Sequence, residues 1–136
     1  MEIDERHWLP YYAMSMNHYR LGELQQAREL AVRSAAAAPW MPLPAGLLAG
    51  LLRRVGENDD ADARLSELRS PSGMFIYHMV CSEMDAAADS LAEAIAQGVM
   101  QQLWFGASDF VRPLRSTLRW PALARMMNLP PETASN

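Results

Sequence analysis

Two stretches of the sequence, GELQQARELAVRSAAAAP from Gly22 and GENDDADARLSELRSPSG from Gly56, begin 34 residues apart. In each, a glycine that can end a helix is followed five residues later by an alanine, Ala27 or Ala61, within a run of helical periodicity. Repetition with a period of roughly 20–50 residues is typical of proteins built from stacked supersecondary units. The two stretches therefore predict repeated helical hairpins.

A third stretch, SEMDAAADSLAEAIAQG from Ser82, aligns with the one from Gly22 and places Ala87 in the position of Ala27. The step from Ala61 to Ala87 is only 26 residues, so the intervening hairpin must be shortened. A small side chain lets two packed helices approach to about 8–10 Å. We therefore expect Ala27, Ala61 and Ala87 at the crossings of paired helices.

Helix-favouring alanine, leucine and methionine dominate the chain, which predicts an all-α fold. Gly22 provides a helix end, the prolines from 39 to 44 break the chain, and residues 70–73 (SPSG) predict a turn. The expected helices span about 8–21, 23–37, 43–55, 59–69, 74–81 and 85–96, with short helices at 100–105, 111–115 and 121–127.

The composition favours one soluble domain of 136 residues, half of them apolar. A net charge of −4 does not suggest a nucleic-acid partner. The N-terminus lacks the pattern of a secretory signal, and the longest apolar stretch, 41–52, is too short to cross a membrane. We expect a cytoplasmic protein with no membrane or nucleic-acid partner.

The spacing of Gly22, Ala27 and Pro39, with Gly56 and Ala61 in the second unit, resembles the tetratricopeptide repeat. The second unit has Gly73 where the family's closing proline would fall. The resemblance implies a right-handed superhelix of antiparallel helical hairpins. About three degenerate units would occupy 8–39, 40–72 and 73–98, followed by C-terminal capping helices over 99–130 and a flexible tail over 131–136.

The C-terminal segment DFVRPLRSTLRWPALARMMNLP, residues 109–130, resembles the end of tetratricopeptide tails in bacterial multidomain regulators. Such tails follow serine/threonine kinase domains or winged-helix DNA-binding domains. Nothing similar to those catalytic or DNA-binding parts occurs in this sequence. We therefore expect the chain to be the tail of a longer regulator and to lack enzymatic activity.

The residues with possible chemistry favour a structural role. His78 and Cys81 have a spacing that could hold a metal, but no second pair of ligands accompanies them. Asp59, Asp60 and Asp62 suit the start of a helix better than paired catalytic carboxylates. No phosphate-binding loop or hydrolase motif is present in the sequence. We predict no metal, no cofactor and no catalytic residue.

Ten methionines could form an adaptable binding surface or fill the core. Helical periodicity predicts that Met14, Met74 and Met84 are core residues, whereas Met16 and Met79 lie on the opposite helix face.

In the family, the inner faces of the first helices of the hairpins line a groove for a peptide or a helix. Gly46 and Gly50 would leave space in this groove, and Arg20 with Arg53 could pair with a carboxylate. The resemblance places the following residues in the groove: Tyr12, Met16, Tyr19, Arg20, Arg53, Arg54, Ile76 and Met79.

The sequence thus favours a protein-interaction module that binds a peptide or helix of a partner protein. The alternative is a structural module that only associates with a second copy of itself. The N-terminal hairpin has no capping helix, so Trp8, Leu9 and Tyr11 could support a weak homodimer. These two functions remain open at the level of sequence.

Overall fold

The computed structural model describes residues 8–98 and 110–127. These residues form helices and no strand, which confirms the all-α prediction. The helices are α1 (Trp8–Arg20), α2 (Leu24–Ala37), α3 (Pro42–Arg54), α4 (Asn58–Glu67), α5 (Pro71–Val80), α6 (Met84–Ala96), α8 (Arg112–Arg115) and α9 (Trp120–Met126). The expected helix at 100–105, the cap residues 99–109 and 128–130 and the tail 131–136 lie outside the described residues.

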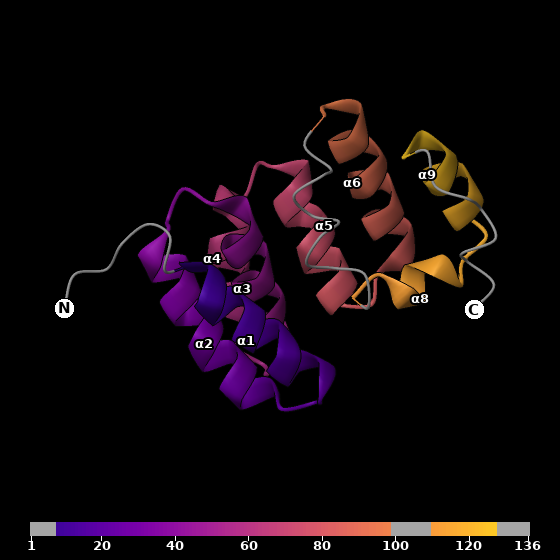
Figure 1. Cartoon of the computed structure of the whole chain (residues 1–136). Helices are drawn as coiled ribbons and strands as arrows, with labels where there is room; N and C mark the ends of the chain where they lie inside the picture. Colours follow the sequence, from indigo (N-terminus) through magenta and orange to yellow (C-terminus); the bar gives the residue numbers. More distant parts are fainter. Residues whose placement is uncertain (1–7, 99–109, 128–136) are drawn as a thin grey trace.

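Sequential helices pack as antiparallel pairs: α1 with α2, α3 with α4, and α5 with α6 (Figure 1). We call these pairs hairpins one, two and three. Hairpin one meets hairpin two through α2 and α3, whereas hairpin two meets hairpin three through α3 and α5. Helices α8 and α9 then pack on α6. The two junctions between hairpins therefore use different helices.

The three hairpin turns share one backbone conformation. Gly22, Gly56 and Ser82 all have positive φ values, of 80°, 91° and 59°. In each turn the next residue, a glutamate, donates its N–H to a carbonyl five residues earlier, with N···O distances of 2.8–2.9 Å. This is the Schellman arrangement that ends a helix. Ser82 therefore occupies the place of the turn glycine, which confirms the alignment of the third stretch.

The alanines five residues after these turns lie in the second helix of each hairpin, α2, α4 and α6. Ala27, Ala61 and Ala87 are all 0% exposed, as the sequence predicted. In hairpin one the Ser15 hydroxyl, also buried, donates a hydrogen bond of 2.7 Å to the carbonyl of Ala27. A larger residue at any of the three positions would push the paired helices apart.

The predicted turn at residues 70–73 is wrong, because α5 begins at Pro71 and only Ser70 lies outside it. Ser70 caps α5, and its hydroxyl accepts a hydrogen bond from the N–H of Ser72. Pro71 takes the first helical position, where a missing N–H costs nothing. Gly73 consequently lies inside α5 and is buried against α3.

The space predicted above Gly46 and Gly50 is also absent, because α5 packs directly on this side of α3. A Cβ atom added to Gly46 would lie 2.1 Å from the carbonyl oxygen of Gly73. One added to Gly50 would lie 2.8 Å from Cβ of Val80. The two glycines therefore permit a close helix crossing and do not widen a groove.

The methionine faces are partly reversed from the prediction. Met14 is 50% exposed, whereas Met16 and Met79 are buried in the core. Met84 packs against the core, as expected. The reason for the reversal in α1 is that Tyr12, Ser15 and Met16 form the stripe that packs in the interior.

The C-terminal helices cover hairpin three. Trp120 is fully buried, and Leu114 and Leu123 join the same core. Arg119, just before α9, forms an ion pair of 2.6 Å with Asp89 of α6. The described part of the predicted cap therefore packs on the last hairpin.

Candidate functional site

Half of the predicted groove residues belong to the hydrophobic core. Tyr12 and Met16 of α1, and Ile76 and Met79 of α5, are each at most 7% exposed. Burial raises the pKa of the Tyr12 hydroxyl, because the charged phenolate is disfavoured away from water. These four side chains offer no accessible surface in this structure, which corrects their assignment as groove residues. Their helices use this face to pack on the rest of the protein.

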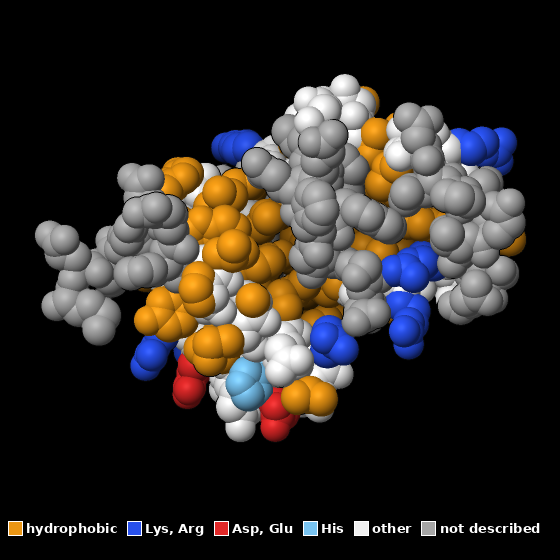
Figure 2. Space-filling model, viewed as in Figure 1, with side chains coloured by type: hydrophobic (Ala, Val, Ile, Leu, Met, Phe, Trp, Pro, Cys, Tyr) orange, Lys and Arg blue, Asp and Glu red, His pale blue; other side chains and the backbone are white. Residues whose placement is uncertain are grey.

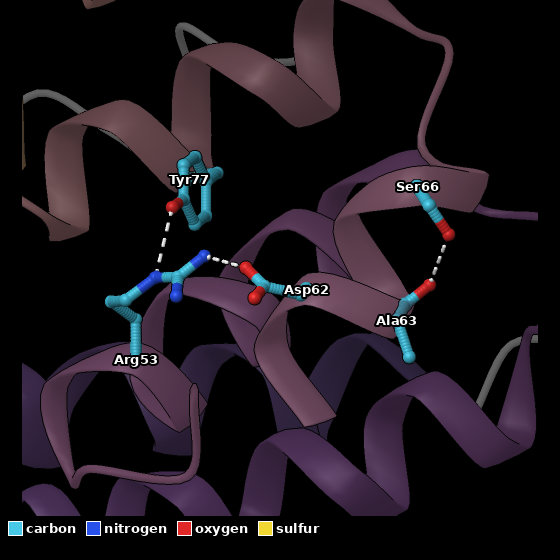
Figure 3. Close-up of polar contacts among 5 residues, drawn as sticks. All are labelled: Arg53, Asp62, Ala63, Ser66 and Tyr77. Atoms are coloured by element: carbon cyan, nitrogen blue, oxygen red, sulfur yellow. Dashed lines mark hydrogen bonds and ion pairs between the residues drawn. The ribbon is translucent and has the colours of Figure 1, made fainter. Parts of the chain in front are cut away.

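The other four predicted residues lie at the C-terminal ends of α1 and α3. Arg53 hydrogen-bonds through Nε to the Tyr77 hydroxyl at 3.3 Å, and its Nη2 forms an ion pair with Asp62 (Figure 3). Arg53 thus links α3 to α4 and α5. The guanidinium of Arg53 is thus already paired with the carboxylate of Asp62. This pairing disfavours the predicted binding of a partner's carboxylate by Arg53.

Arg54 and Tyr19 make a second set of contacts at the same end of the molecule. Arg54 donates through Nη1 to the carbonyl of Val80 at 2.7 Å and so binds the last turn of α5. Tyr19 is partly buried; burial raises the pKa of its hydroxyl, while Arg54 acts in the opposite direction. Its ring lies 6.0 Å from that of Phe110. Arg20 is exposed beside them. Tyr19 and Arg54 thus link the three hairpins and the C-terminal segment.

Cys81 lies within this region, at the end of α5. Burial is the main factor that raises the pKa of its thiol, although a hydrogen bond with Tyr77 lowers it. The thiol is therefore kept protonated, which disfavours a nucleophilic role. His78 pairs instead with Glu83, with Nδ1 2.8 Å from Oε1. Across residues 8–98 and 110–127, no group of three or more potential metal ligands comes together.

A groove on the second helices of hairpins one and two was not predicted from the sequence. It has a volume of about 540 Å³ and lies between α2 and α4, with α3 at its base. Leu48 and Leu52 of α3 form an apolar floor. The walls consist of side chains from the two flanking helices: Arg28, Val32, Asp60, Ala63, Arg64 and Glu67.

The walls of this groove carry charges of both signs. Arg28 is already held by Glu57 through two hydrogen bonds, of 2.7 and 2.8 Å. Arg64 and Glu67 are exposed, and neither forms an ion pair within the described part of the chain. They are therefore available to a ligand. The wall residues are spaced by three and four along α2 and α4, which places them on one face of each helix. This spacing is the feature of the sequence from which the two walls could have been predicted.

The outer face of α1 is the second exposed surface of interest. Leu9 is 54% exposed and Met14 50%, and Leu21, just beyond the helix, is 66% exposed. Figure 2 shows hydrophobic side chains spread over the face of the molecule on which α1 lies. Trp8, by contrast, is partly buried, and its ring packs edge-on against Tyr12 with centroids 5.6 Å apart.

Comparisons with protein-family models, with curated proteins and with solved structures find no match to this chain. The structure therefore shows an all-α protein of sequential antiparallel hairpins, and the comparisons assign it to no family. None of the described helices combines the length and apolar character that a membrane crossing requires.

Proposed function

We propose that this chain is a protein-interaction module of the tetratricopeptide type, which binds a helical segment of a partner protein and catalyses no reaction. The three equivalent turns and the buried alanines after them support a repeat architecture, with the hairpins as degenerate units of a right-handed superhelix. The partner binds in the groove between α2 and α4. This location differs from the inner face that the sequence suggested.

The shape of the groove is the observation that carries the proposal. Leu48 and Leu52 are four residues apart on α3, as are Arg28 and Val32 on α2. On α4, Asp60, Ala63, Arg64 and Glu67 follow the same helical spacing. The groove therefore runs along its helices, and the small side chain of Ala63 leaves room in one wall. An amphipathic helix fits such a groove with its apolar face on the floor.

The charges of the wall define the partner further. Arg64 attracts an acidic side chain, and Glu67 attracts a basic one. Because both groups are exposed to solvent, their contribution to affinity should fall as the salt concentration rises. The proposed partner is thus a helix with an apolar stripe flanked by an acidic and a basic residue.

An array of synthetic amphipathic peptides that vary in their flanking charges tests this function. Wild-type protein should bind the peptides that carry both charges. Ala63→Trp fills the groove and should weaken binding at least about tenfold, which corresponds to a loss of about 1.4 kcal/mol. Gln26→Trp, an exposed position on α2 outside the groove, provides the control of equal bulk and should bind normally.

Two results would contradict the proposal. Either no peptide of the array binds, or the folded Ala63→Trp variant binds the same peptides as strongly as wild type. Circular dichroism of each variant shows whether it is folded.

A further inference from the structure

The groove between α2 and α4 is bridged at one of its two ends. Arg28 of α2 lines the groove and donates two hydrogen bonds, of 2.7 and 2.8 Å, to Glu57, the residue just before α4. This bridge joins the two walls near the start of both helices. Within the described part of the chain no other hydrogen bond or ion pair links α2 to α4, so the end that carries Val32 and Glu67 has no such bridge.

The groove is also short. Its lining residues on α4 run from Asp60 to Glu67, a distance of about 10 Å along the helix axis. That length holds about two turns of a bound helix. A helix that lies on the apolar floor and extends beyond it can leave the groove only at the end away from the bridge. The groove therefore suits one end of a partner helix better than its middle.

The bridged end of the groove is acidic. Glu57 balances the charge of Arg28, whereas the exposed Asp60 lines the groove beside them and forms no ion pair within the described residues. The hydrogen bonds with Glu57 are the main reason that the pKa of Arg28 is raised, and the charges of Glu29 and Asp60 act in the same direction. A helix has partial positive charge and unpaired N–H groups at its N-terminus, and partial negative charge at its C-terminus. An acidic end thus attracts the N-terminal end of a helix.

We infer that the groove binds the N-terminal end of the partner helix, with the first turn of that helix against Asp60. The partner then runs in the same direction as α2 and α4. This inference rests on the function proposed above and adds an orientation to it. Along α4, Asp60 is followed by Arg64 and then by Glu67. The acidic residue of the partner, which faces Arg64, therefore precedes its basic residue, which faces Glu67, by about one helical turn.

Two synthetic amphipathic peptides of about four helical turns test the orientation. Both carry the same leucine stripe. In one a glutamate precedes a lysine by one turn, and in the other the two charges are exchanged. Wild type should bind the glutamate-first peptide about three- to fivefold more tightly at low salt, as expected for exposed ion pairs.

The order of the charges also changes the helicity of the free peptides, so the comparison needs a control on the protein side. Arg64→Glu/Glu67→Arg exchanges the two charges of the wall and should prefer the lysine-first peptide. Both positions are exposed, so this variant should remain folded, which circular dichroism checks.

The N-terminal end itself is tested with the glutamate-first peptide in two forms, one with a free α-amino group and one acetylated. The free amine is charged below its pKa of about 7.7–8.0. Wild type should bind the free form about threefold more tightly at pH 6.5, and the difference should vanish at pH 9. Asp60→Asn should remove the difference at pH 6.5. Asp59→Asn removes the same charge from an exposed position outside the groove and should retain it.

The orientation is wrong if wild type prefers the lysine-first peptide, or if the preference does not reverse in Arg64→Glu/Glu67→Arg. It is also wrong if acetylation leaves binding unchanged, or if Asp59→Asn and Asp60→Asn abolish the effect of acetylation equally. Equal binding of both peptides by wild type would overturn the orientation and leave the groove as the binding site. Binding of neither peptide would overturn both proposals.

Discussion

Two serines of hairpin one are buried although serine is a polar residue that usually lies at the surface. Ser15, a polar residue, is fully buried because its hydroxyl donates to the carbonyl of Ala27. Ser34 of α2 makes a similar bond of 2.9 Å to the carbonyl of Trp8. These two hydrogen bonds join α1 to α2, and Tyr12 and Met16 of α1 are buried in the core.

Tyr12 leads to a prediction about alkaline pH. Its burial raises the pKa of the hydroxyl above the ordinary value of 10 in the folded protein. The unfolded chain therefore loses this proton first, so the contribution of Tyr12 to stability is unchanged below about pH 10 and falls as the pH rises above it. Tyr12→Phe should make this decline shallower, as measured by urea unfolding at a series of pH values.

Tyr19 and Tyr77, whose pKa values burial also raises, should leave part of the decline in the Tyr12→Phe variant. An identical decline in wild type and Tyr12→Phe would show that Tyr12 does not contribute.

At the scale of elements, each hairpin is built around the same turn but stabilised by different side chains. Glu23 and Glu83, which follow the turn residue, pair with His18 and His78, each with Nδ1 2.8 Å from Oε1. Glu57 occupies the same place in hairpin two and pairs instead with Arg28 of the preceding hairpin. The middle turn thus contributes to the junction between hairpins, whereas the outer two stabilise their own hairpin.

Ser82 provides the prediction at this scale. Its φ of 59° lies in the left-handed region, which costs a residue with a side chain about 1–2 kcal/mol and costs glycine almost nothing. Ser82→Gly should therefore stabilise the protein by up to about 1 kcal/mol, after the entropy that glycine loses on folding. Urea unfolding measures the change.

The reciprocal substitution Gly22→Ser places a side chain in the same conformation, at a φ of 80°, and should destabilise the protein by a similar amount. If Ser82→Gly leaves the unfolding free energy unchanged or lowers it, the strain at this turn is not present.

At the scale of the whole molecule, the two junctions between hairpins depend on different interactions. The first places α2 on α3 and carries the Arg28–Glu57 ion pair at its edge. The second brings α3 and α5 close together at Gly46, Gly50 and Gly73. Arg53 and Arg54 then fasten α3 to Tyr77 and to the carbonyl of Val80 on α5. At the second junction the backbones of α3 and α5 therefore lie close together.

The glycines of this junction give a ranked prediction. In Gly46→Ala the new Cβ meets the backbone of Gly73, at 2.1 Å from its carbonyl oxygen, and only a shift of the helices can relieve the clash. In Gly50→Ala it meets the side chain of Val80 at 2.8 Å. Both should destabilise by about 1–3 kcal/mol, with Gly46→Ala at the upper end or beyond.

Urea unfolding of the two variants checks the order. Adding Val80→Ala removes Cγ1, one of the two Val80 atoms that lie 2.8 Å from the new Cβ, and should relieve part of the clash in Gly50→Ala but not in Gly46→Ala. If Gly46→Ala is as stable as wild type, α3 and α5 do not approach as closely as described here.

The sequence alone determined the local structure of this protein. The turns at Gly22 and Gly56, the aligned turn at Ser82 and the alanines that follow them are set by interactions between residues three to five apart, so they are visible in the order of the residues. Most helices were located for the same reason. The predicted turn at 70–73 failed because Ser70 and Pro71 can equally well begin a helix, and the packing of Gly73 on α3 decided between the two.

The tertiary structure decided which helix faces are buried and where surfaces remain for a partner. Helices α1 and α5 have apolar residues on several sides, as in WLPYYAMSMNHYR, so periodicity could not tell which side faces the core. Tyr12, Met16, Ile76 and Met79 are buried because neighbouring helices pack against the faces that carry them. The groove between α2 and α4 likewise exists only because both helices pack on α3. The spacing of its wall residues along each helix is visible in the sequence, but the packing that brings the two helices together is not.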